Sequence, residues 1–179
     1  MRTYLIFGIQ GSGKSTLAPY LANKLEVTYL ATGQMFRSEM AKKSALGKLV
    51  RQRMKQGILI DDETTWKMLE PFLHQHPKGV LLDGFPRNLN QVKFLEKKGI
   101  MIEKVFYLSL PEELAIKRLL TRGREDDTEV GIRNRINLFK EQTLPVFDYY
   151  QKSGVEVVTI DNTPALEEVK KTIDDYFKN

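Results

Sequence analysis

The sequence has 179 residues, of which 41% are hydrophobic and 28% charged, so it can bury the core of a globular domain and is not predominantly disordered. It contains no cysteine, which excludes disulfides and thiolate zinc sites, and its two histidines, His74 and His76, would need carboxylates beside them to hold a metal. The net charge of +5 does not choose between nucleic acid, a membrane surface and a small phosphorylated ligand. Since no apolar stretch reaches membrane-spanning length, we expect a cytoplasmic protein with no membrane partner.

Short runs rich in β-branched, aromatic and leucine residues alternate with longer stretches of helical character and are predicted to be strands. These runs are Thr3–Phe7, Val27–Leu30, Gly79–Leu82, Lys104–Leu110 and Val155–Ile160. Strands that are apolar on both faces and are separated by helices are typical of a parallel sheet covered on both sides. We therefore predict an α/β fold with a five-stranded parallel sheet, in one domain that spans residues 1–179.

Charged residues and prolines predict where several helices begin or change direction. Residues 61–63 are acidic and place negative charge at the start of a helix, where it complements the helix dipole. Pro111 and Pro164 are followed by glutamates and open two further helices, because the fixed φ of proline suits the first helical turn. A helical pattern over residues 128–152 contains Pro145, which is expected to kink or divide it.

A glycine-rich segment follows the first predicted strand directly. Its residues, Gly8-Ile9-Gln10-Gly11-Ser12-Gly13-Lys14-Ser15, match the P-loop pattern and precede a helical run. In such a loop the backbone N–H groups surround a β-phosphate, Lys14 neutralises β- and γ-phosphate oxygens, and Ser15 offers a hydroxyl to Mg²⁺. The residues predicted to bind a nucleoside triphosphate here are Gly11, Ser12, Gly13, Lys14, Ser15 and Thr16.

The third predicted strand ends at an acidic residue, Asp83, directly before the segment Gly84-Phe85-Pro86-Arg87. In P-loop proteins an acidic residue at the end of a second strand lies beside the metal ion. Ser15 and Asp83 therefore form the predicted Mg²⁺ site, with water between the side chains and the ion.

Four motifs occur in an order and spacing that span nearly the whole sequence. They are the P-loop, Thr32-Gly33-Gln34-Met35-Phe36-Arg37, Asp83-Gly84-Phe85-Pro86-Arg87, and Arg124-Glu125-Asp126-Asp127 with Arg133 and Arg135. On these motifs the sequence resembles the adenylate kinase family of nucleoside monophosphate (NMP) kinases, in its short-lid form. The resemblance implies a P-loop NTPase fold and reversible, Mg²⁺-dependent transfer of the terminal phosphoryl group of ATP to AMP, which gives two ADP.

The resemblance also implies how the chain is divided and which residues act. The parts are a core of about residues 1–30, 61–121 and 136–179, a small helical NMP-binding segment of about residues 31–60, and a short lid of about residues 122–135. The residues implied to bind AMP are Thr32, Gly33, Arg37, Gly84, Arg87, Gln91, Arg124 and Arg135. Those implied to bind ATP besides the P-loop are Arg118, Arg122 and Asn162, and those implied to be catalytic are Lys14, Arg87, Arg122, Arg124 and Arg135. Asp126 and Asp127 are implied to orient the arginines.

Two positions favour AMP as the acceptor. The amide of Gln91 can accept a hydrogen bond from N6 of adenine and donate one to N1, whereas pyrimidine kinases of this superfamily typically carry Asn there and Ala at the position of Thr32. The sequence departs from the family pattern at Gln10, Ser15, Gln34 and Asn162, where proline, glycine, aspartate and glycine are common.

The lid is of the shortest kind. Only Gly123 separates Arg122 from Arg124, which leaves no room for a zinc-bearing insertion. We expect this lid to exclude water incompletely and to allow slow ATP hydrolysis when AMP is absent.

Other functions share part of this pattern. A UMP/CMP kinase or a broad-specificity NMP kinase would carry the same P-loop and arginines. A P-loop switch GTPase or binding module would share the loop, but the near match to Asn-Lys-x-Asp, Asn23-Lys24-Leu25-Glu26, lies inside a predicted helix and ends in Glu. Nucleic-acid binding has only the mild positive charge in its favour. We therefore expect small-molecule nucleotides as partners, no nucleic acid, and a monomer.

Overall fold

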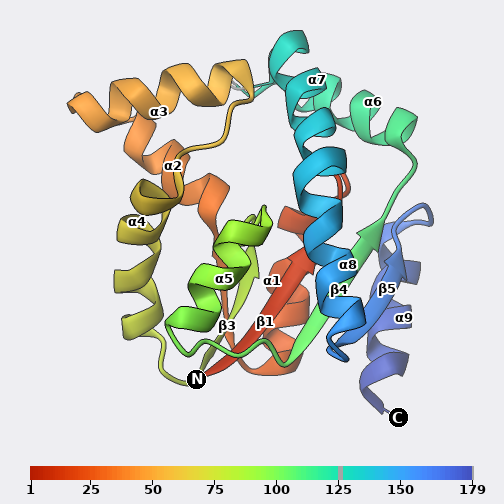
Figure 1. Ribbon diagram of the computed structural model, residues 1–179. Helices are drawn as coiled ribbons and strands as arrows, with labels where there is room; N and C mark the ends of the chain where they lie inside the picture. Colours follow the sequence, from red (N-terminus) through yellow and green to blue (C-terminus); the bar gives the residue numbers. More distant parts are fainter. Residues whose placement is uncertain (125–126, 179) are drawn as a thin grey trace.

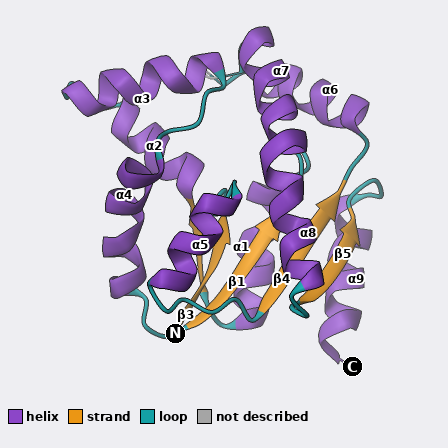
Figure 2. Cartoon of the chain, viewed as in Figure 1, coloured by secondary structure: helices purple, strands orange, loops and turns teal. Residues whose placement is uncertain are grey.

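The structure is a computed structural model that describes residues 1–124 and 127–178, and within these ranges five strands form one parallel sheet (Figures 1 and 2). The strands are β1 (Arg2–Phe7), β2 (Thr28–Ala31), β3 (Gly79–Asp83), β4 (Lys104–Ser109) and β5 (Glu156–Asp161), and they lie in the order β2-β3-β1-β4-β5. All neighbouring strands are parallel. The predicted sheet is confirmed, and each predicted strand end differs from the observed one by at most one residue.

Helices connect the strands and cover the sheet. The α-helices are α1 (Lys14–Leu25), α2 (Thr32–Met40), α3 (Ala45–Gln56), α4 (Asp62–Gln75), α5 (Leu89–Lys97), α6 (Glu112–Arg122), α7 (Glu129–Leu138), α8 (Leu144–Lys152) and α9 (Leu166–Lys178). None of the helices in the described ranges is both long and apolar enough to cross a membrane. The alternation of strands and helices, with every strand pair parallel, is that of an open α/β sheet.

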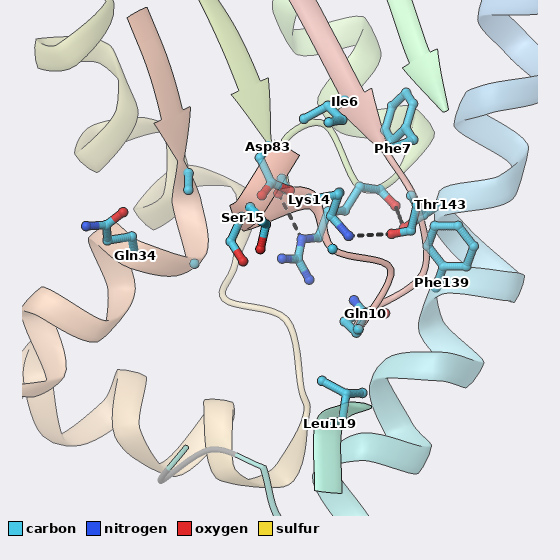
Figure 3. Close-up of a pocket in the computed structure, with 18 of the residues that line it drawn as sticks. Ile6, Phe7, Gln10, Lys14, Ser15, Gln34, Asp83, Leu119, Phe139 and Thr143 are labelled. Carbon is cyan, nitrogen blue, oxygen red and sulfur yellow. Dashed lines mark hydrogen bonds between the residues drawn. The ribbon is translucent and has the colours of Figure 1, made fainter. Parts of the chain in front are cut away.

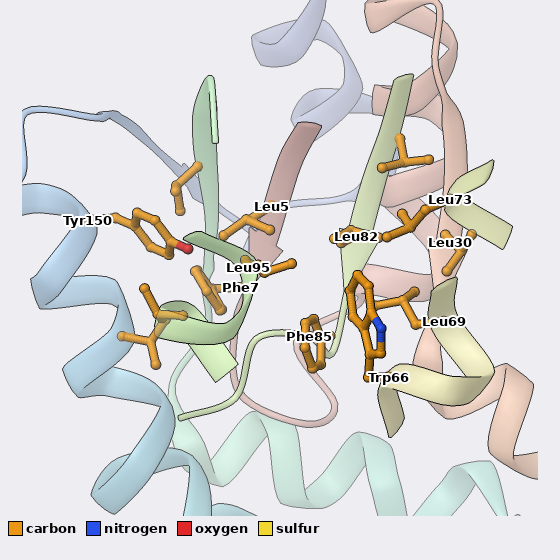
Figure 4. Packing of buried hydrophobic residues seen from close by; sticks show 14 residues of the cluster. Leu5, Phe7, Leu30, Trp66, Leu69, Leu73, Leu82, Phe85, Leu95 and Tyr150 are labelled. Carbon is orange, nitrogen blue, oxygen red and sulfur yellow. The ribbon is translucent and has the colours of Figure 1, made fainter. Parts of the chain in front are cut away.

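The hydrophobic core has two layers, one on each face of the sheet. Alternate residues of β1 enter opposite layers, because successive side chains of a strand point to opposite faces. Leu5 and Phe7 pack with residues of α4, α5 and α8, among them Trp66 (Figure 4). Tyr4 and Ile6 pack on the other side with α1 and α9.

The predicted helix starts lie close to the observed ones, but Pro111 and Pro164 precede α6 and α9 and do not lie in their first turns. Asp61 caps α4, because its side chain accepts a hydrogen bond of 2.8 Å from the backbone N–H of Thr64. Pro111 occupies the capping position of α6. The helical pattern over residues 128–152 is divided by a π-helical turn at Phe139–Thr143, and Pro145 lies in the first turn of α8 behind it.

Helices α2 and α3 project beyond the carboxyl ends of the strands and pack with α4 through a small cluster of their own, which contains Phe36, Met40, Val50 and Ile60. The end of α3 meets the start of α7 (Figure 1). There the hydroxyl of Thr128 donates to the carbonyl of Lys55 at 2.8 Å, and the amide of Asn134 donates to the carbonyl of Gln56 at 2.7 Å. Segments far apart in the sequence thus close over the same edge of the sheet.

Candidate active site

A cleft of about 680 Å³ lies at the carboxyl ends of β1, β2 and β3, which is the usual position of a ligand site in an open α/β sheet (Figure 3). The P-loop forms one part of its wall and the arginine-rich ends of α6 and the following loop form another. The predicted site residues that line the cleft are Gly11, Gly13, Lys14, Ser15, Thr16, Gly33, Arg37, Asp83, Gly84, Arg87, Arg118, Arg122 and Arg124. Residues distributed from position 11 to position 124 are therefore brought to one site.

The glycines of the P-loop are required by its shape. Gly11 and Gly13 have φ angles of 88° and 92°, in the left-handed region that side chains disfavour. A Cβ atom on Gly11 would lie 2.4 Å from the carbonyl oxygen of Ala115, and one on Gly13 would lie 2.4 Å from Nδ2 of Asn162. The backbone can therefore follow this tight path only without side chains at these two positions.

Lys14 is a partly buried cation of the cleft. Its Nζ donates to the carbonyl oxygens of Gly8 at 2.6 Å and Ile9 at 3.1 Å. Burial lowers the pKa of Lys14 to about 8, although the Asp83 carboxylate opposes the shift, and the charges of Arg87 and Arg122 lower it further. An anionic phosphate in the cleft would restore the charge of this ammonium group.

Ser15 and Asp83 line the same cleft (Figure 3). One oxygen of Asp83 accepts a hydrogen bond of 2.8 Å from the hydroxyl of Tyr29, whose pKa is raised by burial and by the nearby carboxylate, so Tyr29 stays a donor. A hydroxyl and a carboxylate are hard oxygen donors that suit Mg²⁺. Within the described residues no three or more His, Cys, Asp or Glu side chains are grouped to hold a metal.

The loop after β5 is fastened to the P-loop from behind. The amide of Asn162 donates to the carbonyl of Ser12 at 2.5 Å, and Arg118 donates to the backbone carbonyl of Asn162 at 3.1 Å. Ser12 and Asn162 are buried, and neither lines the cleft, whereas Arg118 does. Ser12 and Asn162, both predicted to bind ATP, therefore lie behind the cleft wall.

Asp127 holds two of the predicted catalytic arginines. Arg122 donates to it through two nitrogens, at 2.8 and 2.7 Å, and Arg135 donates at 2.8 Å. Burial favours the neutral form of Asp127, whose side chain is only 1% exposed, but the hydrogen bonds and charges of the two arginines prevail and lower its pKa. Asp126, the other acidic residue expected to orient the arginines, lies outside the described residues.

A second, smaller cavity of about 80 Å³ adjoins the cleft. Its wall is formed by Gly33, Phe36, Arg37, Met54, Gly57, Ile58, Leu59, Ile60, Thr65, Gly84, Arg87, Gln91 and Arg135. Gly33, Arg37, Gly84 and Arg87 line both cavities and so mark the place where the two meet. Burial lowers the pKa of Arg87, partly offset by Asp83, and its Nε donates to the carbonyl of Gly84 at 2.8 Å.

Two residues expected near the acceptor base have other polar partners in the structure. Thr32 is buried, donates its hydroxyl to the carbonyl of Asp83 at 3.2 Å, and lines neither cavity. The amide oxygen of Gln91 accepts from the backbone N–H of Arg87, and its amide nitrogen donates to Asp62, both at 2.6 Å. The contact between Gln91 and Asp62 could not be predicted, because nothing in the sequence relates two residues that are 29 positions apart.

Known proteins resemble the chain along nearly its whole length. A family model described as adenylate kinase matches residues 6–155. An adenylate kinase of Prochlorococcus marinus is 40% identical over 167 residues, which cover 90% of this chain and 92% of the relative. Adenylate kinase 1 of a Synechocystis species is 38% identical over 97% of this chain and 96% of its own, and an adenylate kinase of Flavobacterium psychrophilum is 35% identical over the whole of both chains. The chain therefore belongs to the adenylate kinase family and, with it, to the nucleoside monophosphate kinases.

Proposed function

We propose that this protein is an adenylate kinase that transfers the terminal phosphoryl group of ATP to AMP and returns it in the reverse reaction. Family membership supports this proposal, and one feature of the structure carries it: a P-loop cleft and a second, mostly apolar cavity meet at Arg37 and Arg87. A triphosphate bound by the loop and a monophosphate bound in the smaller cavity would meet phosphate to phosphate between these guanidinium groups. Paired arginines suit phosphates, because each can donate two parallel hydrogen bonds.

For phosphoryl transfer the protein has mainly to position the two nucleotides and to supply positive charge. An oxygen of the AMP phosphate attacks the γ-phosphorus of ATP, a new P–O bond forms, and the bond to the β-phosphate oxygen breaks as ADP leaves. The attacking oxygen is already anionic, so no general base is needed. Lys14, Arg87, Arg122, Arg124 and Arg135 would stabilise the negative charge of the transferring group. One phosphoanhydride is broken and another is formed, which makes the reaction readily reversible.

Ser15 and Asp83 would hold Mg²⁺, whose remaining positions phosphate oxygens and water would fill. The bound ion supplies positive charge to the phosphate oxygens of ATP. We also propose that residues 31–60 and 122–135 close over the nucleotides and exclude water, which would otherwise compete with AMP for the phosphoryl group. A cytoplasmic monomer that binds nucleotides rather than nucleic acid, and that needs no zinc, remains our prediction.

A coupled assay of ATP with AMP, GMP, CMP and UMP tests the proposed activity. AMP should be the best acceptor, and the Gln91→Ala variant should have a higher KM for AMP and a smaller preference for AMP over CMP and UMP, with ATP binding nearly unchanged. Equal rates with AMP, CMP and UMP in the wild type would favour a broad-specificity or UMP/CMP kinase. Absence of transfer to every monophosphate would refute the kinase activity altogether.

A further inference from the structure

The carboxamide of Gln91 is held on both of its flanks. Its Oε1 accepts the backbone N–H of Arg87 at 2.6 Å, and its Nε2 donates to a carboxylate oxygen of Asp62 at 2.6 Å. Gln91 as a whole residue is 3% exposed, and it lines the smaller cavity. Gln91 thus faces the cavity proposed for the acceptor base with its amide already hydrogen-bonded.

The two partners determine which end of the amide is oxygen and which is nitrogen. A primary amide has nearly the same shape after a 180° turn, so an unrestrained glutamine can offer its donor and acceptor in either order. The backbone N–H of Arg87 can only donate, and the carboxylate oxygens of Asp62 accept. If the amide were turned over, its NH₂ group would face the N–H of Arg87 and its oxygen would face the carboxylate of Asp62. Both hydrogen bonds therefore form only in the observed direction.

The second carboxamide hydrogen and the second oxygen lone pair remain for a ligand, because a primary amide has two of each. Adenine presents a donor at N6 beside an acceptor at N1. Hypoxanthine and guanine, the 6-oxopurines, present the opposite order: an acceptor at O6 beside a donor at N1. A carboxamide of fixed direction can therefore pair with one of these two edges and leaves both of its groups unpaired against the other.

We propose that Asp62 is a positioning residue that strengthens the selection of adenine over 6-oxopurines at the acceptor site, because it fixes the direction of the Gln91 amide together with the backbone N–H of Arg87. The inference rests on the proposed function, since it takes the smaller cavity as the site of the acceptor base. Asp62 touches Gln91 and acts through it.

The surroundings of Asp62 keep it in place. It is the first residue of α4, next to the capping residue Asp61, and the starts of α4 and α5 lie together. Asn88, which caps α5 by accepting the backbone N–H of Gln91 at 2.9 Å, also reaches the same Asp62 oxygen, at 3.4 Å. The carboxylate thus lies on the capped first turn of α4 and also contacts the residue that caps α5, which restricts its position as a specificity group requires.

The test compares AMP with inosine monophosphate as acceptors in the wild type and in Asp62→Asn. Asparagine has nearly the shape of aspartate but can accept or donate, so turning the Gln91 amide would then cost only its hydrogen bond from the backbone N–H of Arg87. The preference for AMP, as the ratio of kcat/KM values, should fall by roughly tenfold, the effect of one charge-assisted hydrogen bond. The value of kcat/KM for inosine monophosphate should rise in absolute terms, with the KM for ATP unchanged.

Glu63→Gln is the matched control. It removes the same charge at the next position of the same helix, but the side chain of Glu63 is 79% exposed and pairs with Lys67. This variant should keep the wild-type preference. Asp62→Ser, with a hydroxyl that also donates or accepts and that suits a helix start, should reproduce the effect of Asp62→Asn.

Several results would overturn the proposal. If the wild type uses inosine monophosphate as efficiently as AMP, there is no preference for adenine that Asp62 could explain. Variants that lose both activities in equal proportion, keep the wild-type ratio, or fail to melt cooperatively would give Asp62 a structural role only. A wild type that transfers phosphate to neither acceptor would refute the proposed kinase function itself, which separates that failure from failure of the inference.

Discussion

The P-loop and the arginine cluster around Asp127 both present positive charge to the cleft, but they hold it in different ways. Lys14 is the first residue of α1, directly after a loop whose path depends on glycines, and it donates to backbone carbonyls. Arg122 and Arg135 are instead held by a carboxylate at the boundary between α6 and α7. Lys14 is not hydrogen-bonded to a carboxylate, so a bound phosphate would stabilise its charge strongly. The paired arginines are already held in position, but the carboxylate neutralises part of their charge. Substitutions at the loop should therefore affect the chemical step, and substitutions at the cluster should affect positioning.

The largest effect is expected from the loop. Lys14→Met should lower turnover by at least roughly a hundredfold, the scale of one strong electrostatic contact made in the transition state. Steady-state kinetics with saturating ATP and AMP measure it. Lys24→Met, on the same helix but in a partly exposed pair with Asp174, should leave turnover near normal. A folded Lys14→Met enzyme with near-normal turnover would contradict the assigned role.

A smaller effect is expected from the cluster. Asp127→Asn keeps the shape of the side chain but weakens its hydrogen bonds to Arg122 and Arg135, so kcat/KM for ATP should fall by roughly tenfold. The matched control is Glu129→Gln, because Glu129 also pairs with an arginine of α7, Arg133, but both side chains are 75% exposed. If both variants lose activity equally, the difference between the buried and the exposed pair has no functional meaning.

The features that the sequence predicts are local, and those that it does not predict are contacts between distant residues. The strands and the P-loop follow from local patterns, namely apolar runs, glycine positions and a lysine at a fixed spacing. The contacts that decide what each polar group does join distant residues: Asn162 with Ser12, and Asp62 with Gln91. Gln91 was expected to offer its whole amide to a base, and only the packing of α4 against α5 shows that half of it is already used.

The lowered pKa of Lys14 leads to a third prediction, on the pH dependence of ATP binding. The free enzyme loses the Lys14 proton near pH 8, and a bound phosphate raises the pKa again, so the complex binds more protons than the free enzyme. Affinity must then fall as the pH rises through this range, by about threefold from pH 7.5 to pH 8.5. Calorimetric titrations in buffers of different ionisation enthalpy measure both the affinity and the proton uptake.

Lys14→Arg provides the control for this titration, because arginine stays charged over the whole range. ATP affinity in that variant should not change between the two pH values beyond the change caused by ATP itself. An equal decrease in the wild type and in the variant would assign the pH dependence to another group.

The smallest effect concerns how well the short lid excludes water. The start of α7 meets the end of α3, and the amide of Asn134 donates to the carbonyl of Gln56 across this contact. Residues of the proposed NMP-binding segment thus extend a lid in which only Gly123 separates two arginines. Slow ATP hydrolysis without AMP is still expected in the wild type, because the contact depends on a few exposed hydrogen bonds.

Asn134→Ala should raise the ratio of ATP hydrolysis to phosphoryl transfer by roughly threefold, the scale of one exposed hydrogen bond. Asn137→Ala, at an exposed asparagine on the same helix, should leave the ratio unchanged. Phosphate release from ATP without AMP, set against ADP formation with AMP, measures the ratio in each protein. Hydrolysis that stays undetectable in the wild type and in Asn134→Ala would mean that the short lid excludes water on its own. The contact between α3 and α7 would then serve only to join the two segments, and the arginine cluster would have to exclude water through its own packing around Asp127.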